Sequence, residues 1–319
     1  MSEVSSRVAV IDVGTNSTRL LVADVEGGRV EEVDRHTRVT KLGRGVDLTG
    51  MLSSEAVGAV CETVAEYVER YEQLDAEGVR VIATSAVRDA ENGAAFIAEL
   101  RERFDLTAEV LDGDEEARLT YRGATSERAP AQPTLVVDIG GGSTEVVVGC
   151  NCSVDFHTSM QAGGVRHTER HVSSDPPAAA ELEALAADIR GLIDEGVPEE
   201  REAVAQHGIA VAGTPTSLAA IDLELDSYDS ERVHGHRVTL GSIQTMLSQL
   251  ASRPLEQRAE TVGLHPDRAP TIVAGTVILI EVMRAFGLEE IEVSERDILH
   301  GAALDLARGP GPVDSSTRV

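Results

Sequence analysis

Short apolar runs alternate with longer stretches of helical periodicity along most of the chain. Strands are predicted at 8–13 and 18–25, around a polar turn, and again at VRVIATSA (79–86) and in LTAEVLDG (106–113). Helices are predicted from Ser53 or Ser54 to about Leu74, at 92–104 and in EEARLTYRGA (115–124). The stretch 38–50 is predicted to be irregular. Helices that fall between strands are typical of an α/β protein.

The second half of the chain restarts the same alternation. A strand, turn and strand at 136–148 are followed by strands at 209–214 and 290–294. Helices are predicted at 178–196, 215–223, 241–251, 268–286 and from about Arg296 to Leu306. Because the alternation occurs twice, we predict an α/β protein of two similar lobes.

One short motif occurs in both halves of the chain. VIDVGTNSTRLLV at 10–22 and VVDIGGGSTEVVV at 136–148 match, at an offset of 126, in their aspartates (Asp12, Asp138), turn glycines and Ser-Thr pairs. Backbone N–H groups of a glycine-rich turn form an anion-binding concavity, and hydroxyls add donors. An aspartate before such a turn can hold a hydrated Mg²⁺. Either motif alone could be an ordinary tight hairpin; the matched pair favours two turns that grip a polyanion across a cleft.

Composition and charge exclude several partners. The 319 residues hold 55 acids against 28 basic residues, a net charge of −27, and Lys41 is the only lysine. So negative a field repels nucleic acid, and no nucleic-acid partner is predicted. No apolar run approaches the ~20 residues of a membrane span, so no membrane partner is predicted. Three cysteines argue against a disulfide framework and favour a cytoplasmic location.

The chain resembles the exopolyphosphatase/guanosine pentaphosphate phosphatase family of the actin-like ATPase superfamily, in its short two-domain form. The resemblance covers nearly the whole chain and is carried by six segments in the family order: IDVGTNSTRLLV (11–22), ATSAVRDAENG (83–93), DGDEEARLTYRGA (112–124), VVDIGGGSTEVVVG (136–149), QAGGVRHTE (161–169) and AGTPTSLAA (212–220). It implies two ribonuclease H-like domains, 1–125 and 126–295, flanking a central cleft. The last helix, about 296–307, is expected to pack back on the first domain, and 308–319 to be a disordered tail.

The resemblance also implies the chemistry. The family hydrolyses the terminal phosphoanhydride of polyphosphate, here expected to be short-chain, with Mg²⁺ (or Mn²⁺) and an activated water. Guanosine pentaphosphate is the alternative substrate, and a non-catalytic phosphate or nucleotide sensor is a more distant alternative. An ATP-dependent sugar kinase is disfavoured because no aspartate base in a sugar-binding loop is found. A homodimer is left open.

Site residues follow from the family motifs. Glu116 is expected to be the general base, although a glutamate in the first turn of a helix ordinarily only complements the helix dipole. Asp12, Asp138 and Glu145 are expected to hold the metal. The phosphate-binding residues implied are Gly14, Thr15, Asn16, Ser17, Thr18, Arg88, Gly140, Gly141, Gly142, Ser143, Thr144, Gly213 and Thr214.

A few features have local explanations. Asp112 is expected to cap the helix that carries Glu116, with Glu115 completing a capping box. His234 and His236 could be metal ligands on a strand, but surface or cap roles are favoured. At 299 and 300 the chain has leucine and histidine where the family's long form has an arginine and an acid, which puts a phosphate contact from this helix in doubt.

Overall fold

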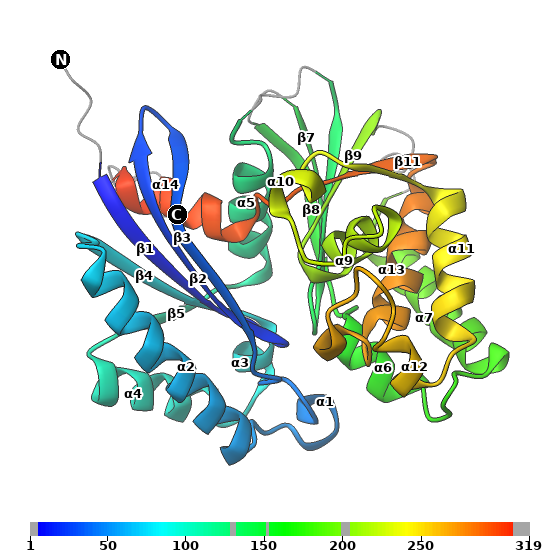
Figure 1. Ribbon diagram of the computed structural model, residues 1–319, viewed down its shortest axis with the longest axis horizontal. Helices are drawn as coiled ribbons and strands as arrows, with labels where there is room; N and C mark the ends of the chain where they lie inside the picture. The colour runs from blue at the N-terminus through cyan, green and yellow to red at the C-terminus, as the bar shows by residue number, and fades with distance from the viewer. Residues whose placement is uncertain (1–5, 128–131, 151–152, 199–204, 309–319) are drawn as a thin grey trace, which may run out of the picture.

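The two repeated motifs form the first two strands of two separate sheets (Figure 1). The structure, a computed structural model, describes residues 6–127, 132–150, 153–198 and 205–308. The first sheet has the order β3 (Arg29–Val39), β2 (Ser17–Glu26), β1 (Ser6–Val13), β4 (Gly78–Ala83) and β5 (Ala108–Val110). The second has the order β8 (Ser153–Met160), β7 (Thr144–Cys150), β6 (Thr134–Ile139), β9 (His207–Val211), β11 (Glu290–Val293) and β10 (Arg237–Thr239).

The two sheets share one topology. In each, the first three strands along the chain pair antiparallel, and the first strand pairs parallel with the fourth. The second sheet differs in its additional edge strand β10, which is antiparallel to β11. The predicted fold class, an α/β protein of two similar lobes, is therefore confirmed.

Helices cover both faces of each sheet. On the outer faces lie α2 (Ser54–Gln73) and α4 (Gly93–Phe104) for the first sheet, and α7 (Ala179–Gly196), α9 (Gly213–Asp222), α11 (Leu240–Ala251) and α13 (Ile272–Ala285) for the second. Further helices lie between the sheets. There α14 (Ile298–Ala307) packs on β1 and β2, and α5 (Gly113–Ala124) packs on β6 and β7.

The two inner helices cross in backbone contact. A Cβ at Gly123 of α5 would lie 1.8 Å from the Asp297 carbonyl oxygen, and one at Gly301 of α14 would lie 2.0 Å from that of Leu119. No side chain fits at either position, so the two helices can approach this closely only with glycine there. The crossing therefore holds α5 in place against α14, including the first turn of α5.

The sequence patterns missed the more polar elements. Only Val30 of β3 is fully buried, and β8 is buried only at Met160, so neither strand shows a continuous apolar run. Short helices were missed as well: α1 (Val46–Thr49), α3 (Ser85–Asp89), α6 (Gly164–His171), α10 (Ser230–Val233), α12 (Leu255–Arg258) and the 3₁₀ turn η1 (Pro266–Arg268). The segment predicted as a tail lies, from residue 309 on, outside the described residues.

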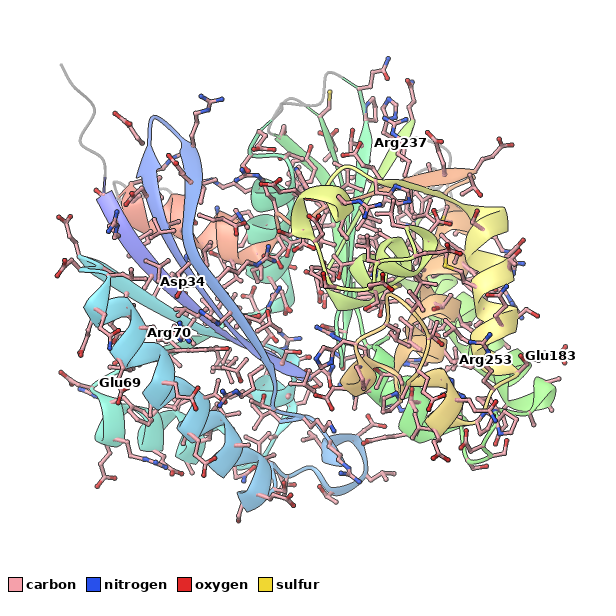
Figure 2. The ribbon with its side chains drawn as sticks, viewed as in Figure 1. Asp34, Glu69, Arg70, Glu183, Arg237 and Arg253 are labelled. Atoms are coloured by element: carbon pink, nitrogen blue, oxygen red, sulfur yellow. The ribbon has the colours of Figure 1, made fainter. Side chains whose placement is uncertain are left out.

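Charged side chains project from the outer helices of both lobes (Figure 2). Glu69 and Arg70 on α2 and Glu183 on α7 are exposed, and Arg70 lies 3.6 Å from Asp34 of β3. Within the described part of the chain, no helix is both long enough and apolar enough to cross a membrane.

Candidate active site

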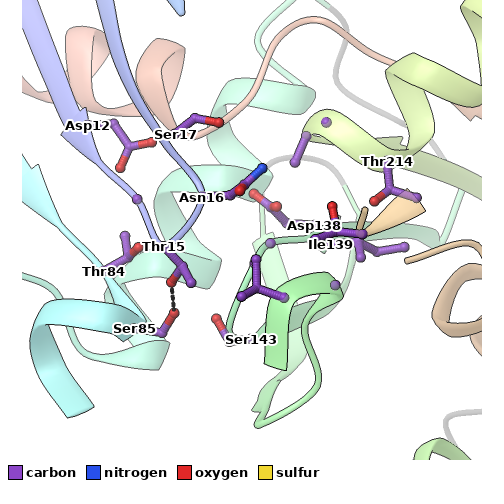
Figure 3. Close-up of a pocket in the computed structure, with 18 of the residues that line it drawn as sticks. Asp12, Thr15, Asn16, Ser17, Thr84, Ser85, Asp138, Ile139, Ser143 and Thr214 are labelled. Carbon is purple, nitrogen blue, oxygen red and sulfur yellow. Dashed lines mark hydrogen bonds between the residues drawn. The ribbon is translucent and has the colours of Figure 1, made fainter. Parts of the chain in front are cut away.

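The two repeated turns line one pocket between the lobes (Figure 3). The turn after β1 meets the turn after β6 closely: a Cβ at Gly141 would lie 2.9 Å from Thr15 Cγ2, and one at Gly142 would lie 2.6 Å from Ser85 Oγ. Thr15 and Ser85 are themselves joined by a 2.8 Å hydrogen bond between their hydroxyls. The prediction that both turns face a common cleft is confirmed.

Each turn is closed by the same backbone hydrogen bond. The Gly14 N–H donates to the Ser17 carbonyl and the Gly140 N–H donates to the Ser143 carbonyl, both at 3.0 Å. Within the described residues, several backbone N–H groups in the turns donate to no backbone acceptor, among them those of Thr15, Asn16, Gly141 and Gly142. Unpaired N–H groups from two facing turns make a site for a phosphate group.

Two buried carboxylates line this pocket and a third lies directly behind its lining. Asp138 and Glu145 are directly opposite each other on β6 and β7 and are 7% and 1% exposed. The inner helix α5 adds Glu116, 7% exposed, and Thr120, whose hydroxyl donates to Asp138 Oδ2 at 3.4 Å. Burial raises the pKa of Asp138 to about 8, with the charge of Glu145 adding to it. Burial and the same neighbour hold the pKa of Glu116 well above its usual range.

The equivalent pair in the first lobe is neutralised internally. Arg19 stands opposite Asp12 on β1 and β2, as Glu145 stands opposite Asp138, and 19 plus the repeat offset of 126 gives 145. The Arg19 guanidinium donates to Asp12 Oδ2 at 2.8 and 2.7 Å and also to Asp297. The repeat thus pairs acid with base in one lobe and acid with acid in the other.

The second pair fits a divalent cation. Among the described residues, Glu116 is the one of the three carboxylates with an arginine in contact: Arg88 Nη1 lies 3.1 Å from Glu116 Oε2. The cleft carboxylates do not bring three oxygens within 4.8 Å of one another in the described structure. Mg²⁺ is suited to such a site, because it binds one or two carboxylates and completes its shell with water and phosphate oxygens. In the first lobe, Asp12 Oδ1 is buried without a hydrogen-bond partner among the described residues.

Several predicted residues line the pocket as expected: Asp12, Gly14, Thr15, Asn16, Ser17, Glu116, Asp138, Gly140, Gly141, Ser143, Gly213 and Thr214. Gly142, Thr18 and Thr144 do not line this pocket. The Thr18 hydroxyl bonds that of Thr40 at 3.0 Å, and the Thr144 hydroxyl donates to the Ala162 carbonyl at 2.6 Å. Both are fully buried, and their predicted phosphate contacts find no support in this geometry.

Arg88 and Glu145 lie just behind the lining. Arg88 Nη1 donates to the Leu111 carbonyl at 2.8 Å as well as to Glu116, so it holds the start of α5 and the carboxylate together. Glu145 Oε1 accepts a 2.7 Å hydrogen bond from Ser159 Oγ on β8. In the described structure, Arg88 therefore positions Glu116.

Arg19 and Arg268 line the pocket without having been predicted. Arg268, the last residue of η1, lies against the start of α9: a Cβ at Gly213 would be 1.9 Å from its Nη1. No carboxylate pairs with Arg268 in the described part of the chain. Burial and the charge of Arg19 lower its pKa to about 10. A lone arginine in a short irregular segment gives no sequence signal, whereas Arg19 could have been found as the repeat partner of Glu145.

A group of ion pairs joins the lobes at the mouth of the cleft. Asp47 on α1 accepts from Arg166 and, at 2.5 and 2.7 Å, from Arg170, both on α6 of the second lobe. Arg166 also donates to Asp89 at 2.6 Å. The Gly45 N–H donates to Glu169 at 3.0 Å. These contacts, which we term the latch, hold the two lobes together on one side.

The local expectations have mixed outcomes. Asp112 caps α5, accepting from the Glu115 N–H at 2.8 Å, as predicted. The capping box was wrong, because the Glu115 carboxylate pairs with Arg118 at 2.6 Å instead.

The histidines and the C-terminal departure have structural partners. His234 Nε2 lies 3.2 Å from Glu127, and His236 Nε2 lies 2.8 Å from Asp222. Leu299 is buried in the core between α14 and the first sheet. His300 Nε2 lies 2.9 Å from Glu32 of β3. The leucine and histidine at 299 and 300 thus serve packing and pairing within the first lobe.

Known proteins resemble this chain over nearly its whole length. Exopolyphosphatase 2 of Mycobacterium tuberculosis is 38% identical over 316 residues, which cover 95% of this chain and 99% of that protein. A guanosine-5'-triphosphate,3'-diphosphate pyrophosphatase of Pseudoalteromonas translucida is 28% identical over 89% of this chain and 56% of its own length. The crystal structure of an exopolyphosphatase-like protein superposes with a TM-score of 0.90 at 35% identity, covering 95% of this chain and 98% of that one.

The profile of the Ppx/GppA phosphatase family matches residues 21–308. This match includes most of β2, both inner helices and the whole second lobe. It therefore covers the pocket except for β1, the turn after it and the first residues of β2, among them Ser17 and Arg19. The chain belongs to the Ppx/GppA phosphatase family.

Proposed function

We propose that the protein is an exopolyphosphatase that removes the terminal phosphate of short inorganic polyphosphate. The observation that carries the proposal is the buried acid-acid pair Asp138 and Glu145, next to unpaired N–H groups from two turns. The turns can bind the oxygens of a terminal phosphate, and the carboxylates can hold a cation beside it. The similarity to exopolyphosphatase 2 over the full chain agrees with this function.

The substrate would enter past the two unpredicted arginines. Arg268 faces the pocket without a carboxylate partner in the described structure, so its charge is available to a phosphate. Arg19 is held in place by Asp12 and Asp297 and presents a fixed guanidinium on the same side. Against a net charge of −27, these local cations are needed to attract an anion.

Glu116 would act on the attacking water. Its carboxylate is buried beside Asp138 and Glu145, and Arg88 fixes its position from the far side. A raised pKa makes Glu116 a stronger base than a solvent-exposed glutamate. Phosphoryl transfer has a loose transition state, so orienting the water and accepting its proton late are sufficient.

Asp138 and Glu145 would hold the divalent cation together with Asp12, whose Oδ1 is buried without a hydrogen-bond partner among the described residues. When bound, Mg²⁺ or Mn²⁺ would neutralise charge on the phosphate oxygens that develops during transfer. The protein holds both carboxylates buried and facing each other. The register of β6 and β7 places Asp138 opposite Glu145, and the hydrogen bond from Ser159 fixes Glu145.

Guanosine pentaphosphate is the second candidate, favoured by a specific feature. Beside Gly213 a second cavity adjoins the phosphate pocket and shares Arg19, Ala212, Gly213 and Arg268 with it. Tyr228, 54% exposed, lines this cavity together with Arg35 and Arg38. An aromatic ring and arginines suit a nucleoside with additional phosphates.

Phosphate release from short polyphosphate, long polyphosphate, guanosine pentaphosphate and ATP, measured side by side with Mg²⁺, tests the proposal. We expect short polyphosphate to give the highest kcat/KM. A strong preference for guanosine pentaphosphate would favour the second candidate. A preference for chains of hundreds of phosphates, or no release from any of the four, would contradict the proposal.

A further inference from the structure

Two histidines and an aspartate form a compact cluster away from the phosphate pocket. His167 and His171 are four residues apart on α6 and therefore lie on one face of the helix. Asp188 of α7 faces them, with its Oδ2 at 2.8 Å from His171 Nε2 and 3.4 Å from His167 Nε2. One nitrogen from each ring and one carboxylate oxygen all lie within 4.8 Å of one another.

One ligand atom of this cluster is buried and unpartnered. His167 is fully buried, and its Nε2 has no hydrogen-bond partner among the described residues, despite the 3.4 Å approach of Asp188. The side chains of His171 and Asp188 are 19% and 38% exposed, so an ion could reach the cluster from solvent. None of the three residues lines the phosphate pocket or takes part in the hydrolysis proposed above.

We propose that His167, His171 and Asp188 bind one Zn²⁺, with water in the fourth position. Two imidazoles and a carboxylate are a usual ligand set for zinc, and neighbouring helices often supply it as a pair four residues apart plus one more residue. The cleft carboxylates offer oxygen donors only, which suit Mg²⁺. The two sites therefore select different metals.

Zinc binding would be coupled to the second phosphate turn. The Gly163 N–H donates to His167 Nδ1 at 3.2 Å, so that nitrogen is unprotonated and the ring proton is on Nε2. When Nε2 binds zinc, the neutral ring must carry its proton on Nδ1, and Gly163 loses its acceptor. No proton is gained or lost by the ring in this exchange.

Gly163 is in contact with the phosphate turn. A Cβ there would lie 2.3 Å from the Gly141 carbonyl oxygen and 2.4 Å from the Gly142 nitrogen. Two N–H groups of α6 also donate to the Gly141 carbonyl, that of Val165 at 2.9 Å and that of Arg166 at 3.1 Å. Zinc bound to His167 would therefore change a hydrogen bond of Gly163, the residue that contacts the second phosphate turn. Zinc binding could in this way regulate phosphate binding.

Equilibrium dialysis tests the site directly. Tag-free protein stripped with a chelator is dialysed against Zn²⁺ in excess Mg²⁺, which occupies the oxygen-only site, and bound zinc is counted by mass spectrometry. We expect one zinc per chain in the native protein and an affinity at least about tenfold weaker in His171→Gln and in Asp188→Asn. His236→Gln is the matched control, because His236 Nε2 lies 2.8 Å from Asp222 but, within the described residues, belongs to no cluster of three metal-ligating groups.

Co²⁺ supplies a second readout that does not depend on activity. Cobalt in a tetrahedral site with nitrogen ligands absorbs visible light strongly, whereas cobalt on carboxylates and water absorbs weakly. We expect the strong bands in the native protein and in His236→Gln, and their loss in Asp188→Asn, whose near-identical shape preserves the fold. Equal zinc binding by the native protein and both cluster variants, or only the weak cobalt spectrum, would overturn the proposal and leave the hydrolase function untouched.

Discussion

Replacing Glu116 by glutamine should stop the reaction while leaving the pocket intact. Glutamine keeps the size of the side chain and an oxygen that can still accept from Arg88, which lies 3.1 Å away in the native protein. What is lost is the ability to take a proton from water. A positioned general base contributes ~10²–10⁴ in rate, equivalent to ~2.7–5.4 kcal/mol of activation free energy.

The surroundings of Glu116 also fix the sign of the effect on binding. Its charge is buried beside Asp138 and Glu145, so glutamine removes repulsion between like charges and between Glu116 and the substrate. We expect KM to be unchanged or lower, and the thermal midpoint to be unchanged or higher. Single-turnover phosphate release with Mg²⁺ and excess enzyme separates this loss of chemistry from any change in binding.

Glu115→Gln is the control in the same helical turn. Glu115 is paired with Arg118 at 2.6 Å near the surface, with 31% of its side chain exposed. Such a pair contributes at most ~1 kcal/mol to stability, and turnover should stay near the native value. If Glu115→Gln abolished hydrolysis while Glu116→Gln did not, the assignment of the base would be wrong by one residue. If neither substitution mattered, Glu145 would be the next candidate.

The other predictions concern the metal, the turn and the latch. The pKa of Asp138 is raised to about 8, so in metal-free protein its contribution to stability is present at low pH and is lost as the pH rises through 8. The rise in melting temperature caused by Mg²⁺ should therefore be larger at pH 8 than at pH 6, and equal rises would count against a cation at Asp138. Gly163→Ala should lower kcat/KM at least about tenfold, because its Cβ would lie 2.3 Å from the Gly141 carbonyl oxygen. Gly191→Ala, in open space on α7, should instead stabilise by up to ~1 kcal/mol and leave kinetics unchanged. Asp47→Asn removes the latch carboxylate that pairs with both Arg166 and Arg170, and it should increase the radius of gyration measured by small-angle X-ray scattering. An unchanged radius of gyration would show that this carboxylate does not hold the lobes together.

The parts that could be predicted from the sequence are those encoded locally. The repeated hairpins were found because strand, turn and strand occupy thirteen contiguous residues in each half. The same motif also predicts which of its hydroxyl side chains face away from the pocket. Side chains alternate between the two faces along a strand. Ser17 and Arg19 therefore face the pocket, whereas Thr18 faces the core. In the second motif Ser143 faces the pocket and Thr144 faces the core.

What could not be predicted depends on topology. Arg268 reaches the pocket because η1 lies beside the start of α9, a proximity between segments some fifty residues apart (213 to 268) that no local pattern records. The strands β3 and β8 were missed because each has one side turned largely to solvent, which leaves no apolar run to detect. The contact between Arg88 and Glu116 could not be predicted for a similar reason, because it depends on how α3 and α5 meet.

The placement of α14 has a consequence for how the protein is made. The face of the first sheet that carries Val8, Val10 and Leu21 is covered by the helix Ile298–Ala307, which is synthesised last. From the end of α5 at Ala124 to Ala307 the ribosome adds 183 residues (307 − 124), which takes roughly 10–40 s at usual rates of translation. During that time the apolar face of the first sheet is uncovered in the nascent first lobe. We expect a chaperone to bind this face until α14 is made. A chain released before α14 would keep that face open, and such fragments should aggregate rather than persist as a folded half.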